Sequence, residues 1–256
     1  MSSTILVTGG TGVLGSHVVP LLRGEGRPVR VLSRRQHPGE DGVEYVTGDL
    51  LNDEGTTAAV SGVETILHLA GGPKGDDVAT RNLVRAAEKE GVAHLVYISV
   101  IAVDRIPLGY YRSKLASERV IVESRVPWTT LRAAQFHDLV LKVLDAAAKL
   151  PLIPAPAGIR LQPVDSGEVA ARLVALAAAG PAGLATDLAG PSVRGLPELI
   201  RSYLEAKDQR RRTMPLPIPG RLGRLYREGE NLSLQDVDTG ERTWESFLGQ
   251  RVTALR

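Results

Sequence analysis

Short apolar runs alternate with longer amphipathic stretches through most of the chain. The short runs predict strands, and the stretches with apolar positions three and four residues apart predict helices. The expected strands cover residues 4–8, 29–32, 43–46, 65–69, 94–99 and 128–131. The expected helices cover residues 11–23, 110–124 and 137–149, with another ending near Glu90. Such alternation indicates βαβ units, and therefore a parallel sheet with right-handed crossovers.

The pattern changes after Lys149. Prolines at positions 151, 154 and 156 interrupt any helix there, before an expected helix at 166–179 and an expected strand at 185–188. Proline, arginine and polar residues increase from Gly190 onward, with helical fragments at 197–206 and 243–248. We therefore predict an α/β fold, a doubly wound parallel sheet of the Rossmann type over residues 1–190. Residues 191–256 form a small C-terminal lobe on the carboxyl edge of the sheet, intertwined with it.

Composition narrows the class of protein. A chain of 256 residues can bury a sizeable core without crosslinks, and the absence of cysteine excludes disulfides, zinc-thiolate sites and a cysteine nucleophile. This usage fits a reducing compartment, so we expect a cytoplasmic protein. We recognise no signal peptide and no 18-residue apolar run.

Charge gives little evidence for a polyanionic partner. The 31 basic and 29 acidic residues nearly balance, and we interpret the arginines at positions 210–212, 221, 224 and 227 as a solvated face. We expect a small-molecule substrate, with no nucleic acid, membrane or metal partner. A monomer and a homodimer both remain open.

A glycine loop follows the first strand, in "ILVTGGTGVLGSH". Gly9, Gly12 and Gly15 allow a tight turn, close approach of a diphosphate to the backbone, and close packing of helix on strand. The N terminus of the next helix attracts the phosphates, so we include Thr11, Val13 and Leu14 among the cofactor contacts. The alternative is a structural turn without a ligand.

The second strand ends in "VRVLSRR". Ser33, Arg34 and Arg35 stand where an NAD site would offer a carboxylate to the ribose diol. A guanidinium pairs with a 2′-phosphate, so NADP(H) is the preferred cofactor, with Arg34 as its main contact and NAD(H) as the alternative. Two solvated arginines are the other interpretation.

Two further strand ends offer cofactor contacts. Asp49 and Leu50, after the third strand, are placed to meet the amino group and the ring of adenine. Leu69, Ala70 and Gly71 end the fourth strand in small residues, which lets the nicotinamide half of a cofactor approach the backbone.

Four segments together resemble the short-chain dehydrogenase/reductase superfamily, specifically its atypical NmrA-like or extended branch: "TGGTGVLG", "VLSRR", "YYRSKLASE" and "LQPVDSGEVA". The likeness covers the chain to about residue 190. It implies a Tyr-x-x-x-Lys pair beside the nicotinamide, with a serine upstream.

Tyr110 and Lys114 match that pair. Residues four apart share a helical face, so both can point at the cofactor, whereas Tyr111 is rotated away. The ammonium should lower the pKa of the tyrosine hydroxyl, and the lysine can also bind a ribose hydroxyl. An ordinary helix start with a solvated lysine is the alternative.

The upstream serine is displaced. In "HLVYISVIAVD" the usual catalytic position falls on Val100, with Ser99 one residue early and facing the other side of an extended strand. Ser99 therefore serves either in catalysis or only as a backbone partner. Gln135, Phe136 and His137 follow the sixth strand and are candidates for a substrate pocket, although a core position for Phe136 and a capping role for His137 fit equally well.

The leading hypothesis is an NADP(H)-dependent oxidoreductase acting on a carbonyl, quinone or activated alkene, with Tyr110 and Lys114 as the proton-donating pair. The second is a non-catalytic dinucleotide sensor, which the missing serine favours. The third is a nucleotide-sugar epimerase or dehydratase, for which the C-terminal lobe is short.

Overall fold

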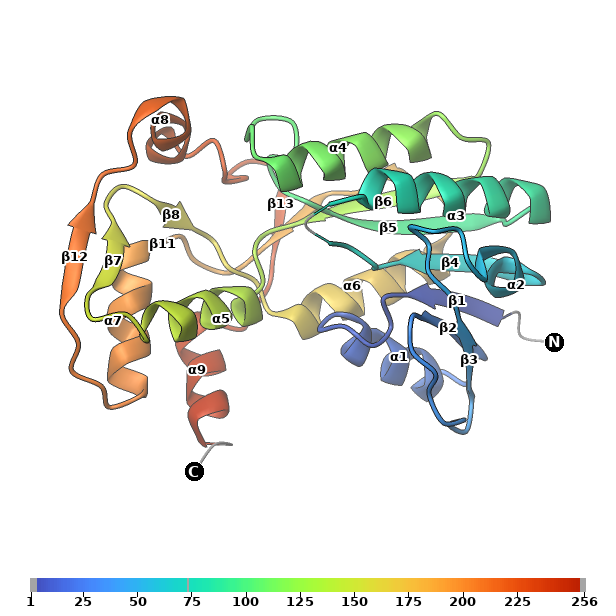
Figure 1. The fold of residues 1–256 in the computed structure, drawn as a ribbon, viewed down its shortest axis with the longest axis horizontal. Helices are drawn as coiled ribbons and strands as arrows, with labels where there is room; N and C mark the ends of the chain where they lie inside the picture. The colour runs from blue at the N-terminus through green and yellow to red at the C-terminus, as the bar shows by residue number, and fades with distance from the viewer. Residues whose placement is uncertain (1–3, 73, 254–256) are drawn as a thin grey trace. The chain divides into compact units, whose positions relative to one another are not determined.

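The computed structural model describes residues 4–72 and 74–253, and Figure 1 shows the fold. The chain divides into two compact units. Unit 1 holds the described residues up to Asp104, Leu108–Arg132 and Gly167–Ala185, and unit 2 holds Arg105–Pro107, Ala133–Ser166 and the chain from Thr186 onward. This division differs from the expected boundary at residue 190, because residues 133–166 belong with the C-terminal part.

Unit 1 is built on a sheet with the strand order β3-β2-β1-β4-β5-β6, and β9 also pairs with β6. The strands are β1 (Thr4–Thr8), β2 (Val29–Ser33), β3 (Val43–Thr47), β4 (Val63–His68), β5 (His94–Val100), β6 (Trp128–Ala133) and β9 (Gly183–Leu184). The pairs from β3 through β5 are parallel. The order reverses between β1 and β4, which is where a doubly wound sheet binds its ligands. The predicted α/β class is confirmed.

Helices cover both faces of this sheet. They are α1 (Gly15–Gly24), α2 (Thr56–Val60), α3 (Asp76–Glu90), α4 (Gly109–Val122) and α6 (Ser166–Ala179). Figure 1 shows α3 and α4 on one face, with α1 and α6 on the other. Leu83 of α3 and Ile121 of α4 share an apolar core with Leu95 and Tyr97 of β5. Every residue of β5 is buried, as expected of a strand covered on both faces.

Unit 2 combines helices with short strands. They are α5 (His137–Ala147), β7 (Ile153–Pro156), β8 (Arg160–Leu161), β10 (Asp187–Ala189), β11 (Arg194–Gly195), α7 (Leu196–Ala206), β12 (Thr213–Leu216), α8 (Gly220–Glu228), β13 (Val237–Thr239) and α9 (Trp244–Thr253). β7 pairs with β12, β8 with β11 and β10 with β13. Tyr203, Trp244 and Phe247 form its core with Leu144. The sequence predicted α7 and α9 but missed most of the strands, which are too short to show an alternating pattern.

Two boundaries differ from the predicted ones in ways that affect the site. α1 begins at Gly15 instead of Thr11, because the glycine loop occupies the intervening residues. β5 continues to Val100 instead of ending at Ser99. Ser99 is therefore a strand residue, with its neighbours facing the opposite side of the sheet.

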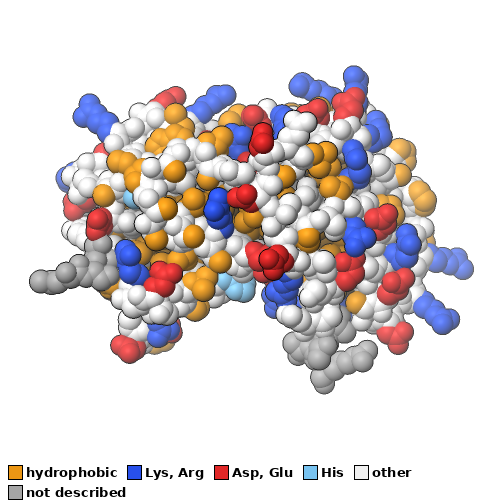
Figure 2. Space-filling view, turned by 180° about the vertical axis from the view of Figure 1, so that it is seen from behind, with side chains coloured by type: hydrophobic (Ala, Val, Ile, Leu, Met, Phe, Trp, Pro, Cys, Tyr) orange, Lys and Arg blue, Asp and Glu red, His pale blue; other side chains and the backbone are white. Residues whose placement is uncertain are grey.

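The surface carries both signs of charge. Figure 2 shows basic and acidic side chains interspersed over the face that it presents. Within residues 4–72 and 74–253, no helix is long and apolar enough to cross a membrane. The same residues contain no group of three or more His, Asp or Glu side chains arranged to hold a metal ion.

Candidate cofactor and catalytic site

The glycine loop joins β1 to α1 at the carboxyl edge of the sheet in unit 1. Gly9 has a φ of 71°, and a Cβ there would lie 2.7 Å from the backbone nitrogen of Ala70. A Cβ on Gly15 would lie 2.4 Å from the Cα of Gly10. Both positions require glycine, because the loop backbone packs against itself and against the segment after β4.

Gly12 is less crowded than Gly9 and Gly15. A Cβ there would meet only the carbonyl oxygen of Gly9, at 3.3 Å, among the described atoms. Thr11, Gly12 and Val13 are exposed, whereas Leu14 is buried. No side chain from the described part of the chain caps the N terminus of α1. Bare backbone at a helix N terminus suits a diphosphate.

The end of β2 presents two arginines to solvent. The hydroxyl of Ser33 accepts the N–H of Arg35 at 3.2 Å and lies 3.0 Å from His37 Nε2. Arg34 and Arg35 are exposed, and none of the ion pairs between described residues involves either of them. The positive charges of the two guanidiniums are therefore not neutralised by a carboxylate in the described structure, and a 2′-phosphate would suit them.

Asp49 keeps its predicted place after β3, whereas Leu50 differs from the prediction. The carboxylate of Asp49 accepts the N–H of Leu51 at 2.9 Å and the amide of Asn52 at 3.3 Å, so it stabilises its own turn. Leu50 is 6% exposed and packs in the core, so its side chain presents little surface to an adenine ring. Leu51, 48% exposed, is the apolar side chain left at the surface.

The segment after β4 lies next to the lysine of α4. Leu69 and Ala70 are partly buried and Gly71 is exposed. A Cβ on Gly71 would stand 3.2 Å from Nζ of Lys114 and 3.4 Å from Oδ2 of Asp76. The absence of a side chain at Gly71 therefore leaves room next to the buried charge pair of Lys114 and Asp76.

Lys114 is 4% exposed and is held by three neighbours. Its Nζ donates to the carbonyl oxygen of Ile98 at 3.3 Å, lies 3.4 Å from Oδ2 of Asp76, and sits 4.8 Å from the centroid of the Tyr97 ring. The sequence reasoning missed Asp76. The sequence predicted only the end of α3, near Glu90, so the acidic residue at its start was not recognised.

Tyr110 is the second residue of α4. It is 41% exposed, while Tyr111 is buried, so the two rings face different surroundings as predicted, edge to face at 5.8 Å. Desolvation by the protein on its covered side raises the pKa of the Tyr110 hydroxyl, and this outweighs the lowering by the Lys114 ammonium. The expected net decrease in the tyrosine pKa is therefore wrong.

Ser99 has hydrogen-bonding capacity that the protein does not use. It is 5% exposed, and its hydroxyl has no hydrogen-bond partner among the described residues. The strand alternation puts it on the same face of β5 as Tyr97, and Val100 on the other. The interpretation of Ser99 as a simple backbone partner does not hold.

The three candidate substrate residues lie in unit 2. Gln135 and Phe136 are partly buried. His137 is wholly buried, with its ring 5.1 Å from that of Phe247 and 5.8 Å from that of Trp244, and burial lowers its pKa. We therefore assign His137 to core packing and not to substrate binding.

A buried histidine supports the base of the glycine loop. His68 Nδ1 lies 2.7 Å from the hydroxyl of Thr8, its Nε2 lies 3.1 Å from the hydroxyl of Thr80, and its ring stacks on Tyr97. Burial, and to a lesser extent the Lys114 charge, lowers the pKa of His68 to about 3. The ring is neutral at physiological pH and connects β1, β4 and α3.

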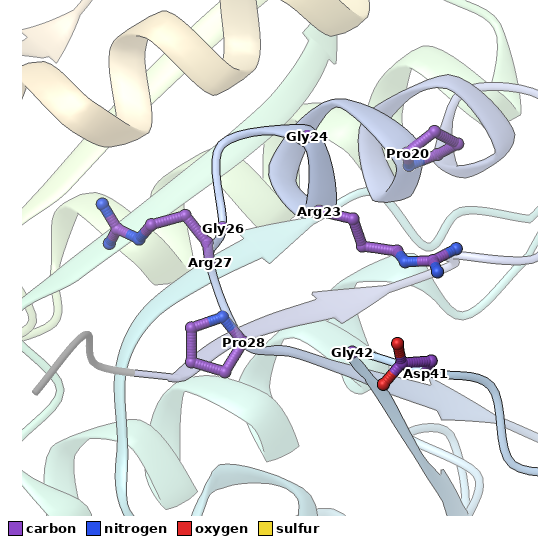
Figure 3. Close-up of a pocket in the computed structure, with 8 residues that line it drawn as sticks. All are labelled: Pro20, Arg23, Gly24, Gly26, Arg27, Pro28, Asp41 and Gly42. Carbon is purple, nitrogen blue, oxygen red and sulfur yellow. The ribbon is translucent and has the colours of Figure 1, made fainter.

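A surface cavity of about 660 Å³ lies elsewhere in unit 1 (Figure 3). The end of α1 and the segments entering β2 and β3 line it, including Arg23 and Asp41. These segments are at the amino ends of the strands, on the edge opposite the glycine loop. We therefore do not assign this cavity to a dinucleotide.

Comparison with known proteins agrees with a dinucleotide site at the glycine loop. Residues 9–179 match the protein family described as NAD(P)H-binding. Quinone oxidoreductase 2 of Escherichia coli (strain K12) is 26% identical over 206 residues, which cover 76% of this chain and 71% of that protein.

Two solved structures share the fold. A nucleoside-diphosphate-sugar epimerase from Staphylococcus aureus has a TM-score of 0.78 at 20% identity, over 97% of this chain and 100% of that one. A short-chain dehydrogenase/reductase superfamily protein from Agrobacterium tumefaciens with bound NAD has a TM-score of 0.73 at 21% identity, over 98% and 97%. The glycine loop, the fold and the family match over residues 9–179 lead to one conclusion: the chain belongs to the NAD(P)H-binding family, and it shares its fold with a short-chain dehydrogenase/reductase superfamily protein.

Proposed function

We propose that the protein is an NADP(H)-dependent oxidoreductase that reduces a quinone, a carbonyl or an activated alkene of a small molecule. The observation that carries the proposal is the placement of Lys114, buried beneath Gly71 and one helical turn from the partly exposed Tyr110. The likeness to a quinone oxidoreductase supports the same reaction class.

Each part of the site has a task in this reaction. The loop around Gly12 binds the diphosphate, Arg34 and Arg35 bind the 2′-phosphate, and Lys114 binds a ribose hydroxyl. NADPH, when bound, supplies the hydride. Tyr110 gives its hydroxyl proton to the substrate oxygen that gains negative charge.

The direct test is a turnover assay. Purified protein is mixed with NADPH or NADH and a panel of quinones, carbonyl compounds and activated alkenes, and cofactor oxidation is followed by absorbance. We expect turnover of at least one class, faster with NADPH than with NADH. Binding of NADPH without turnover on the whole panel would argue against the proposal.

Arg34→Ala should lower the affinity for NADPH by about 10- to 100-fold, because a charge-assisted hydrogen bond to the 2′-phosphate is worth ~1.5–3 kcal/mol. The affinity for NADH should change little, since NADH lacks that phosphate. Calorimetric titration of both cofactors measures the effect, and Arg34→Lys serves as the charge-retaining control. Equal losses of affinity for NADPH and NADH would mean that Arg34 does not bind the 2′-phosphate.

Gly12→Ala and Gly15→Ala separate ligand contact from folding. Gly12→Ala should fold with only a small loss of stability, since its methyl would meet one backbone oxygen at 3.3 Å. It should bind NADPH at least about tenfold more weakly (~1.4 kcal/mol), because the methyl would crowd the loop backbone that a diphosphate approaches. Gly15→Ala should lose about 1–3 kcal/mol of unfolding free energy, because its methyl meets backbone atoms. Urea unfolding and calorimetry measure the two effects. Unchanged NADPH affinity in Gly12→Ala would remove the loop from the cofactor site.

A dinucleotide sensor is the second candidate, favoured by the apolar Val100 at the usual serine position. A sensor distinguishes NADP⁺ from NADPH in affinity and turns over neither. The same titrations, run with both redox forms, discriminate between the two functions.

A further inference from the structure

Asp76 is the carboxylate paired with Lys114. It is the first residue of α3 and is 6% exposed. Oδ1 accepts the backbone N–H of Gly72 at 2.6 Å, and Oδ2 lies 3.4 Å from Nζ of Lys114. Oδ2 has no hydrogen-bond partner among the described residues, so the contact with Lys114 is an ion pair that is longer than a good hydrogen bond.

The place of Asp76 favours a negative charge. A helix N terminus stabilises an anion, and the Lys114 ammonium adds an opposite charge within ion-pair distance. Both partners are almost fully buried, where charges interact more strongly than in water. Removing either partner alone would leave an uncompensated buried charge.

Lys114 is held in place as well as neutralised. An ammonium has three N–H donors: the carbonyl oxygen of Ile98 takes one at 3.3 Å, and a second can be directed at Asp76. One N–H then remains for a bound ribose. The ring of Tyr97 packs against Nζ at 4.8 Å and limits its movement.

Both Lys114 and Asp76 influence the pKa of the Tyr110 hydroxyl. Desolvation raises the pKa of its hydroxyl most, the Lys114 ammonium lowers it, and the Asp76 carboxylate raises it again. Tyr97 of β5 and Tyr111 of α4 also raise it. The pair also acts on its buried neighbours: the Lys114 ammonium lowers the pKa of His68 of β4, and the Asp76 carboxylate, together with Glu118 of α4, raises the pKa of Tyr97.

We propose that Asp76 is a positioning residue that fixes Lys114 against β5 and cancels its charge, so that Tyr110 works as a neutral proton donor and the site favours reduction. The proposal rests on the oxidoreductase function proposed above. A neutral phenol can give a proton but cannot take one, whereas oxidation of an alcohol requires the tyrosinate as base. Reduction should therefore persist to higher pH than in a site with an unpaired lysine.

Asp76→Asn tests the charge cancellation in the cofactor-free protein. The titration of Tyr110 is read from tyrosinate absorbance, as the difference between each protein and its Tyr110→Phe counterpart. We expect the midpoint to move to lower pH in Asp76→Asn. Asp77→Asn is the matched control, because Asp77 lies in the same turn but contacts Ser113 instead, and its midpoint should match the wild type. An unchanged or higher midpoint in Asp76→Asn would overturn the proposal.

A double-mutant cycle of Asp76→Asn and Lys114→Gln separates the effect of charge from that of misfolding. Lys114→Gln alone should raise the midpoint, because Asp76 is then unpaired. The combined change should return it close to the wild-type value, because both charges are gone. A combined variant that keeps the full shift of either single change would also overturn the proposal.

The pH profile of turnover gives an independent readout. In Asp76→Asn, reduction should decline at lower pH than in the wild type, and oxidation of the matching alcohol by NADP⁺ should increase. If neither protein turns over any substrate, the proposed function fails, while the titration of Tyr110 still decides the role of Asp76.

Discussion

Tyr110→Phe should lower kcat for NADPH-dependent reduction by about 10²–10⁴-fold, the usual effect of removing a general acid. The substitution deletes one hydroxyl from a residue that is 41% exposed, so neither folding nor cofactor binding should change much. The measurements are kcat at saturating NADPH and the NADPH dissociation constant by calorimetry.

Tyr111→Phe is the matched control for this variant. It removes the same group from the neighbouring residue, which is buried and therefore not open to a substrate. We expect its kcat to stay near the wild-type value. Equal turnover in Tyr110→Phe and wild type would remove Tyr110 from the chemistry, and equal losses in both variants would point to a general disturbance of α4.

His68→Asn should make the protein less sensitive to acid. The fold lowers the pKa of His68 to about 3, and an unfolded histidine titrates near 6.5. Between pH 6.5 and 3 the unfolded chain binds a proton at His68 that the folded chain does not. The folded state is therefore favoured fully above pH 6.5, and this contribution to the unfolding free energy decreases as the pH falls toward 3. Each pH unit in that window costs about 1.4 kcal/mol, which amounts to ~5 kcal/mol overall.

Unfolding free energies from urea titrations, at several pH values between about 7 and 4, measure this effect. The asparagine amide can replace the hydrogen bond that Nδ1 makes with Thr8, but it is too short to reach Thr80. His68→Asn should therefore lose about 1 kcal/mol of unfolding free energy at neutral pH, and it should also lose the proton-linked part of the slope. His94 and His137 are also buried with lowered pKa values and titrate in both proteins. Identical slopes in the two proteins would show that His68 does not control the acid sensitivity.

The glycine loop could be located from the sequence because its residues are contiguous. The glycines at positions 9, 12 and 15 form a local turn after β1, and such turns leave a pattern that can be read directly. Arg34 and Arg35 follow β2 and are exposed, and their contact with a cofactor stays a prediction. The spacing of Tyr110 and Lys114 likewise places them on one helical face without any knowledge of tertiary contacts.

The remainder depends on tertiary packing. Asp76 meets Lys114 only because α3 and α4 lie side by side on the same face of the sheet, which no local pattern records. Leu50 and Leu51 differ by one position, and only the packed core determines which of them is buried. The direction of the Tyr110 pKa reversed for the same reason, since desolvation by surrounding residues exceeds the effect of the lysine that the sequence made visible.

The close packing of the glycine loop has a consequence for the kinetics of nucleotide capture. With Gly9 seated against Ala70 and Gly15 against Gly10, the loop has little freedom to rearrange before a ligand arrives. The conformational entropy of ordering it is lost during folding, and binding does not incur that loss again. Association should therefore follow a single exponential whose rate rises linearly with nucleotide concentration, as for a preorganised receptor.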